Sequence, residues 1–161
     1  MIPLSGIPRE QRTPELCLEA VTACGDDLAY VPKEYRTYDL CLLAVTQSGW
    51  VIPFVPEEHQ TPEMCLAAVK SNGEVLYAMP FRQRSPEVCL AAVKQSGRVL
   101  DEVPKKLLTL EMCLIAVKLD AWAIVHMPKE FKTKEVCLAA INQDGRAVRY
   151  SRWSILELMN T

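Results

Sequence analysis

Residues 13–36 read TPELCLEAVTACGDDLAYVPKEYR, and the same 24-residue pattern follows five more times without an insertion. Each copy carries one cysteine at the same place: Cys17, Cys41, Cys65, Cys89, Cys113 and Cys137. A fixed period of roughly 20–50 residues is typical of stacked repeat proteins, in which each unit buries its apolar face against its neighbours. The sequence therefore predicts a repeat array rather than a single compact core.

The opening of each copy predicts the start of a helix. A threonine stands there, or Ser85 in the fourth copy, and such a side chain caps the first turn. An acidic residue such as Glu15 follows two positions later, where the helix dipole favours it. Cys17, Ala20 and Val21 then lie on one face. We expect a helix of about ten residues.

The second half of each copy predicts a turn and a shorter helix. A recurring glycine, Gly25 in the first copy, suits a left-handed residue at the helix end. Ala121 replaces it in the fifth copy, so we expect a strained or differently shaped end there. A short helix over residues 26–31 should end at Pro32, because proline disfavours helix at the preceding residue.

The fold class that follows is all-α: a right-angled stack of short helix-turn-helix repeats forming an α-solenoid. Leucine-rich repeats have a similar period and are the alternative, but they need an L-x-x-L-x-L strand. Here the equivalent segment is bracketed by helix caps and filled with helix-forming residues.

We expect one domain over residues 1–161. Residues 6–12 match the end of a repeat and form an N-terminal half-repeat, while residues 13–156 hold the six full repeats. In the last copy Ser151 and Arg152 replace the usual Val-Pro pair, so residues 151–161 are expected to form a C-terminal cap. Terminal repeats are usually atypical because they must seal an open core.

The pattern T-P-E-x-C-L-x-A-V-x-x-x-G-x-x-L-x-x-V-P resembles a short alpha-helical repeat family catalogued as domain of unknown function number four-one-one-six. The resemblance covers residues 6–156. It implies a repeat architecture and binding to other proteins, and it offers no catalytic residues to carry over.

The cysteines predict packing rather than chemistry. Adjacent helices lie roughly 8–10 Å apart, which is too far for a disulfide between equivalent positions, so the six recurring thiols should be buried as small apolar groups. Cys24 has polar equivalents in the other copies and is expected near the surface. No close pair of cysteines suits zinc, so we expect no metal and no cofactor.

Unpaired cysteines and hydropathy indicate a cytoplasmic protein. No apolar run approaches the ~20 residues that a membrane span needs.

Residues 1–80 hold five basic and eleven acidic residues, a balance of −6, whereas residues 81–161 hold thirteen basic and nine acidic residues, a balance of +4. The two ends of a rod would then carry opposite fields that steer a partner; the alternative is simple drift among solvated side chains.

The candidate binding residues are those at which the repeats differ, because the invariant columns already serve the fold. Aromatic and arginine side chains there are typical of interface anchors. Residues four apart should share a helix face, as in Trp50 with Phe54, Trp122 with His126 and Arg146 with Tyr150. The alternative is that Trp50 and Trp122 plug the core. We name this set the variable stripe: Asp26, Tyr30, Trp50, Phe54, Glu74, Tyr77, Arg98, Asp101, Trp122, His126, Arg146, Arg149 and Tyr150.

The sequence thus favours a non-enzymatic binding protein, since no nucleophile, base and orienting group occur in a recognisable arrangement. The most concrete version is an immunity protein that neutralises a bacterial toxin, such as a nuclease, with its acidic half facing a basic partner. The alternatives are a pathogen effector or adaptor that binds a host protein, and a nucleic-acid-binding repeat that uses the basic C-terminal half. A net charge of −2 argues against nucleic acid.

Overall fold

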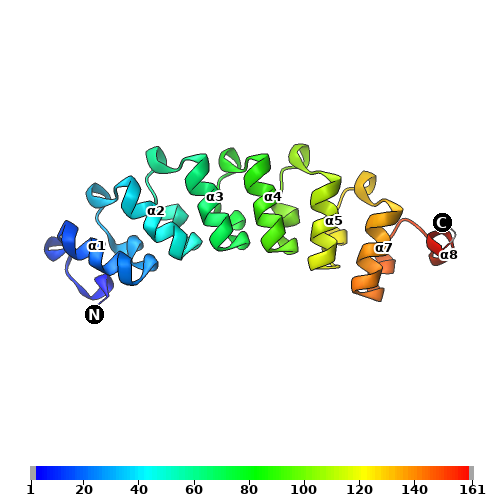
Figure 1. The fold of residues 1–161 in the computed structure, drawn as a ribbon, viewed down its shortest axis with the longest axis horizontal. Helices are drawn as coiled ribbons and strands as arrows, with labels where there is room; N and C mark the ends of the chain where they lie inside the picture. The colour runs from blue at the N-terminus through cyan, green and yellow to red at the C-terminus, as the bar shows by residue number, and fades with distance from the viewer. Residues whose placement is uncertain (1–2, 160–161) are drawn as a thin grey trace.

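The computed structural model describes residues 3–159 as an elongated stack of helices that follow one another in chain order (Figure 1). Each of the six long helices spans ten residues and packs against the next. They are α1 (Pro14–Ala23), α2 (Tyr38–Gln47), α3 (Pro62–Ser71), α4 (Pro86–Gln95), α5 (Leu110–Leu119) and α7 (Lys134–Gln143). Every regular element within residues 3–159 is helical. This confirms the all-α repeat stack over the leucine-rich alternative.

The predicted helix starts are confirmed at all six copies. The hydroxyl oxygen of Thr13 accepts a hydrogen bond from the Leu16 backbone N–H at 3.3 Å. The equivalent threonine or serine does the same in every other repeat, at distances of 3.2 to 3.4 Å. Such a cap satisfies one of the N–H groups that the first turn leaves without a partner.

The second half of the unit consists of two 3₁₀ helices. A six-residue 3₁₀ helix follows most long helices: η3 (Gly25–Tyr30), η5 (Gly49–Phe54), η7 (Gly73–Ala78), η9 (Gly97–Glu102) and η12 (Gly145–Tyr150). A three-residue 3₁₀ helix after the proline leads to the next repeat: η4 (Lys33–Tyr35), η6 (Glu57–His59), η8 (Phe81–Gln83), η10 (Lys105–Leu107) and η11 (Lys129–Phe131). The predicted short helix is thus a 3₁₀ helix, and the segment after the proline is helical as well.

Further helical segments flank the array. The 3₁₀ helices η1 (Leu4–Gly6) and η2 (Arg9–Gln11) precede α1, and α8 (Ile155–Met159) follows the last repeat. Leu4 is fully buried, and its 3₁₀ helix contacts η3. The N-terminal half-repeat in the structure therefore includes residues ahead of residue 6.

The prediction of a left-handed glycine at the helix end is wrong, because no residue within 3–159 has a positive φ. The long helix ends instead in an extended residue, such as Cys24 with φ −151° and ψ 112°. A Cβ on Gly25 would lie 2.6 Å from the Ala44 carbonyl oxygen of the next repeat. Glycine recurs because adjacent repeats approach too closely for a side chain.

The fifth repeat shows the altered connection expected at Ala121. A turn at residues 121–122 leads into a short α-helix, α6 (Ala123–His126), in place of a six-residue 3₁₀ helix. The Cβ of Ala121 explains the difference, since it cannot approach a neighbouring carbonyl as closely as glycine does. Ala121 is nonetheless buried.

The core runs through the array as a continuous column of small and medium apolar side chains. In the third repeat it comprises Cys65, Ala68 and Val69 from the long helix, and Leu76 from the 3₁₀ helix. The equivalent residues of the other repeats join the same cluster, except in the sixth repeat, where Ile141 and Val148 are only half-buried. Burial of these apolar faces against both neighbouring repeats is what holds a stack of short helices together.

Candidate protein-binding surface

The aromatic members of the variable stripe are solvent-exposed. Their exposed fractions lie between 38% and 45% for Tyr30, Trp50, Phe54, Tyr77, Trp122 and Tyr150. The two tryptophans therefore do not plug the core. Exposed aromatic side chains carry a large apolar surface that water disfavours.

The polar members of the variable stripe are also accessible. Glu74 is half-buried, and the others are exposed: Asp26, Arg98, Asp101, His126, Arg146 and Arg149. The stripe thus follows the connections between the long helices, from η3 to η12.

The contacts within the stripe run between repeats rather than within one short helix. The rings of Trp122 and Tyr150 meet edge to face with centroids 5.8 Å apart, and the Arg146 guanidinium lies 5.3 Å from the Trp122 ring centroid. The Tyr77 hydroxyl lies 3.2 Å from the Arg98 carbonyl oxygen, to which it donates. Residues four apart are not aligned in the 3₁₀ helices that carry Trp50 with Phe54 and Arg146 with Tyr150, because a 3₁₀ helix has three residues per turn. Trp122 and His126, at the short α-helix of the fifth repeat, line the same cavity.

Ion pairs neutralise two of the arginines. Arg98 Nε lies 3.2 Å from Asp120 Oδ2, and Arg146 Nη2 lies 2.7 Å from Asp144 Oδ2. Hydrogen bonds from Arg146 lower the pKa of the Asp144 carboxyl, and the same contact raises the pKa of Arg146. This part of the stripe presents aromatic rings beside internally paired charges.

A cavity of about 320 Å³ opens between the fourth and fifth repeats, next to Tyr77 and Trp122. Desolvation, followed by the nearby Asp101 carboxylate, raises the pKa of the Tyr77 phenol. This phenol therefore stays protonated and acts as a hydrogen-bond donor. The complete lining is Tyr77, Arg98, Asp101, Asp120, Trp122, Ala123 and His126.

The cysteines lie where the sequence places them: the six recurring thiols are buried and Cys24 is exposed. Burial raises the pKa of Cys41 to about 11 and that of Cys113 to about 12. Such thiols remain protonated near neutral pH and are poor nucleophiles. Within residues 3–159 no group of three or more potential metal ligands comes together.

One acidic residue of the N-terminal half has a structural role. Asp27 is buried, and its carboxylate accepts a hydrogen bond from the Leu4 backbone N–H at 3.4 Å. It fastens the N-terminal segment to the first repeat.

None of the helices described here is both long and apolar enough to cross a membrane.

A second set of structural residues was missed from the sequence: the residue just before each capping threonine or serine. Arg36 Nε donates to the Val31 carbonyl of its own repeat at 2.9 Å, and Arg36 Nη1 donates to the Phe54 carbonyl of the next repeat at 2.6 Å. We call this double contact the arginine clamp. It joins consecutive 3₁₀ helices at their C-terminal ends, where a cation is favoured.

The arginine clamp recurs at other junctions. Arg12 makes the same two contacts at 2.8 and 2.6 Å, and Arg84 makes them at 2.9 and 2.6 Å. Lys132 reaches only the next repeat, at 3.4 Å. The signal in the sequence is a column reading Arg, Arg, Gln, Arg, Leu, Lys at residues 12, 36, 60, 84, 108 and 132.

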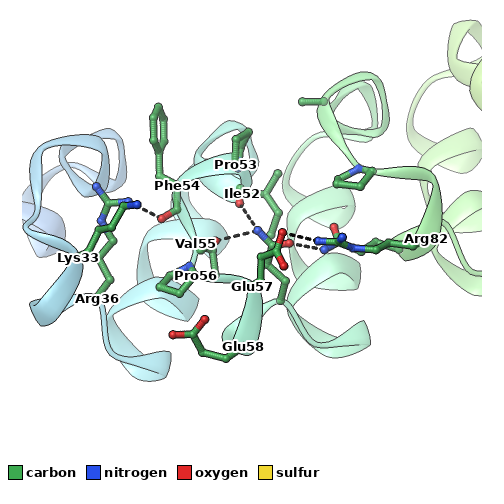
Figure 2. A pocket seen from close by; sticks show the side chains of 14 residues that line it. Lys33, Arg36, Ile52, Pro53, Phe54, Val55, Pro56, Glu57, Glu58 and Arg82 are labelled. Carbon is green, nitrogen blue, oxygen red and sulfur yellow. Dashed lines mark hydrogen bonds and ion pairs between the residues drawn. The ribbon is translucent and has the colours of Figure 1, made fainter.

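A groove of about 630 Å³ lies where Gln60 interrupts this column, at the junction of the second and third repeats. Figure 2 shows Lys33 and Arg36 at one end and Arg82 at the other, with the Arg36 guanidinium directed at the Phe54 carbonyl. Glu57 and Arg82 form an ion pair of 2.7 Å across the wall. The floor includes backbone carbonyls of Ile52 and Val55, which accept hydrogen bonds from the Gln60 amide.

Comparison with known proteins identifies the chain by family alone. No curated protein and no solved structure matches it. A family described as "Domain of unknown function (DUF4116)" matches residues 13–60 and 109–155, which are the first two and the last two repeats. These segments make up more than half of the sequence. The chain therefore belongs to the DUF4116 family of tandem helical repeats.

Proposed function

We propose that the protein is a non-enzymatic binding module that recognises another protein through the variable stripe. The observation that carries this proposal is the set of exposed aromatic rings on the short helical segments of five of the six repeats. Tryptophan, tyrosine and arginine are the usual energetic anchors of protein interfaces. Stacked repeats commonly bind through one extended surface of this kind.

The most concrete form of the proposal is an immunity protein that neutralises a bacterial toxin, with an acidic N-terminal half attracting a basic partner. Asp26, Glu57 and Glu58 are exposed there. Complementary charge of this kind speeds association and falls off with salt. A host-binding effector or adaptor would use the same stripe and differ in its partner.

The nucleic-acid alternative has weaker support. Arg146 is paired with Asp144, and the Trp153 ring is flanked by Lys134 and Arg152 at 5.3 and 5.0 Å. The Trp153 indole N–H also donates to the Lys132 carbonyl at 3.2 Å. A ring held in this way is less available for stacking on a base.

Affinity capture from the native cells, read by mass spectrometry, tests the proposal. The wild-type chain should retain a protein that the double variant Trp122→Ala/Tyr150→Ala loses at least about tenfold, as expected for removal of interface anchors. Leu18→Ala is the control, because Leu18 is more exposed than either aromatic residue but lies on α1, outside the stripe. Equal capture by the double variant and the control would contradict the proposal.

The immunity version has its own test. The chain should restore growth when it is co-expressed with the product of the toxic gene beside its own, and the Trp122→Ala/Tyr150→Ala variant should not. Protection should also weaken when Asp26 and Glu58 are neutralised, because association would slow. Absence of protection by the wild-type chain would contradict the immunity function and leave the effector or adaptor as the proposed function.

A further inference from the structure

The junction between the second and third repeats has hydrogen-bond acceptors that other junctions give to an arginine. Gln60 donates to the Val55 carbonyl at 2.8 Å and to the Ile52 carbonyl at 3.3 Å, both in its own repeat. At the neighbouring junctions the Phe54 and Glu102 carbonyls accept from an arginine of the preceding repeat. The equivalent acceptor at this junction is the Ala78 carbonyl. Within residues 3–159, no side-chain donor reaches the Ala78 carbonyl oxygen.

A second acceptor at this junction follows from how two amides are oriented. The Gln60 NH₂ group must face the two carbonyls, so its Oε1 points the other way and accepts from Gln83 Nε2. The Gln83 Oε1 atom is then left buried with no hydrogen-bond partner among the described residues. A buried acceptor of this kind costs free energy until a donor meets it.

Both glutamines line the large groove, which also holds Ala78. Of the charged side chains that face it, Arg36 is committed to backbone carbonyls and Arg82 to Glu57. Glu58 and Lys33 form no ion pair among residues 3–159. The groove thus has one unpaired carboxylate, that of Glu58, and Lys33 at its far end (Figure 2). It also has two neutral acceptors: the Ala78 carbonyl, and the buried Gln83 Oε1, which a ligand reaches once the Gln83 side chain turns toward the groove.

We propose that this groove binds an arginine side chain of a protein partner, whose guanidinium donates to the Ala78 carbonyl and to Gln83 Oε1. The proposal rests on protein binding as the function, and it adds a site to the variable stripe. The protein itself shows the fit: guanidinium groups meet the equivalent carbonyls of Tyr30, Phe54 and Glu102 at 2.6 Å. A planar group with five donors suits several acceptors at once.

Lysine should fit less well. Lys132, the one lysine in the column, lies 3.4 Å from the Tyr150 carbonyl and makes no bond within its own repeat. Its ammonium is also more strongly hydrated than a guanidinium, so it loses more on entering a groove that already holds Arg36 and Arg82.

The test uses blocked tripeptides and the full chain. Acetyl-Gly-Arg-Gly-amide should give saturable NMR shifts of the Gln60 and Gln83 side-chain amides, with at least about tenfold tighter binding than the peptide with citrulline, an uncharged isostere, in place of arginine. The lysine peptide should bind more weakly than the arginine peptide. Gln60→Arg should abolish peptide binding, because its own guanidinium would then occupy the groove.

Leu108→Arg is the matched control, because it adds an arginine to the same column two junctions away and should leave peptide binding unchanged. Gln83→Leu removes one acceptor and should weaken binding severalfold. The Trp122→Ala/Tyr150→Ala variant should bind the peptide like the wild type, so failure of the stripe and failure of the groove are distinguishable. No saturable shift, equal binding of arginine and citrulline peptides, or undiminished binding to Gln60→Arg would overturn the proposal.

Discussion

At the scale of single residues, the recurring glycine sets the distance between repeats. A Cβ at Gly73 would lie 2.6 Å from the Ala92 carbonyl oxygen and 2.7 Å from Gln95 Cβ, whereas a Cβ at Gly145 would meet nothing within 4 Å. Gly73→Ala should therefore lower the free energy of unfolding by about 1–3 kcal/mol, as for other overpacked sites. Urea unfolding measures it.

Gly145→Ala is the control for this prediction. Its φ is not positive, and it stands in the same column without a following repeat. We expect a change of at most about 0.5 kcal/mol, or a small gain from reduced freedom of the unfolded chain. Equal losses in the two variants would mean that backbone conformation, not close approach, requires the glycine.

The buried thiols make stability depend on alkaline pH. Burial raises the pKa of Cys41 to about 11 and that of Cys113 to about 12, from an ordinary value of about 9. Above pH 9 the unfolded chain loses these protons first, so the stability present below that pH falls as the pH rises toward the folded values. At pH 10 each of these two thiols should cost about 1 kcal/mol.

Urea unfolding at pH 8 and pH 10 measures this loss, and Cys41→Ala/Cys113→Ala should reduce it. A thiol reagent at pH 7.5 gives an independent check, because Cys24 is exposed and the other six cysteines are buried. One thiol should react quickly in the folded protein and the remainder only with denaturant. Rapid reaction of all seven would show that the recurring cysteines are accessible.

At the scale of the element, the arginine clamp ties the ends of consecutive 3₁₀ helices together. Arg36 donates to the carbonyls of Ala29, Val31 and Phe54. Arg84 is more deeply buried and also pairs with the Glu102 carboxylate at 2.7 Å. Arg36→Leu should cost about 1–2 kcal/mol and Arg84→Leu about 2–4 kcal/mol, because the latter leaves a partly buried carboxylate without its partner.

Thermal and urea unfolding of these variants, with Arg98→Leu as control, measure the clamp. The Arg98 side chain is 74% exposed, and an exposed ion pair such as Arg98–Asp120 contributes only about 0.2–1 kcal/mol. Arg36→Lys should fall between wild type and Arg36→Leu, as the single contact of Lys132 indicates. Similar losses for Arg98→Leu and Arg84→Leu would contradict the role of the clamp.

The parts of the fold that the sequence predicted are those set within one repeat. The cap at Thr13 and the buried face of Cys17 depend on neighbours along the chain, and periodicity reveals them. Gly25 and Arg36 act between repeats, so a single unit does not show their purpose. The sequence does not distinguish a glycine that permits close approach from one that adopts a positive φ. For this reason the prediction of a left-handed glycine at the helix end was wrong.

The candidate site divides in the same way. The exposure of the variable stripe follows from the disagreement among repeats, because a column that accepts both Trp50 and Arg98 cannot be buried. The contact between Trp122 and Tyr150 and the groove at Gln60 could not be predicted from the sequence and are seen only in the structure. The first is a contact between side chains 28 residues apart. The second arises because Gln60 is an exception in the column of the arginine clamp, whose role is visible only in the structure.

At the scale of the whole molecule, stability should be distributed by position along the stack. Each long helix packs against the long helices next to it in the chain. α3 and α4 therefore have a complete repeat on each side, while α7 is the last long helix among residues 3–159 (Figure 1). Gly145 is exposed and Val148 is half-buried, because among residues 3–159 no further long helix packs on this side of the sixth repeat. Hydrogen exchange should therefore be slowest in α3 and α4 and faster in α7.

Gly73→Ala provides a sharper version of this prediction, because it weakens one junction in the middle of the array. In a stack governed by contacts between neighbours, the free energy lost at the junction of the third and fourth repeats spreads mainly to adjacent units. Exchange should rise most in α3 and α4 and least in α1 and α7, whereas Gly145→Ala should leave the profile unchanged. A uniform rise across all helices would show that the molecule unfolds as one cooperative unit, and that the stack is bound together by more than its consecutive junctions.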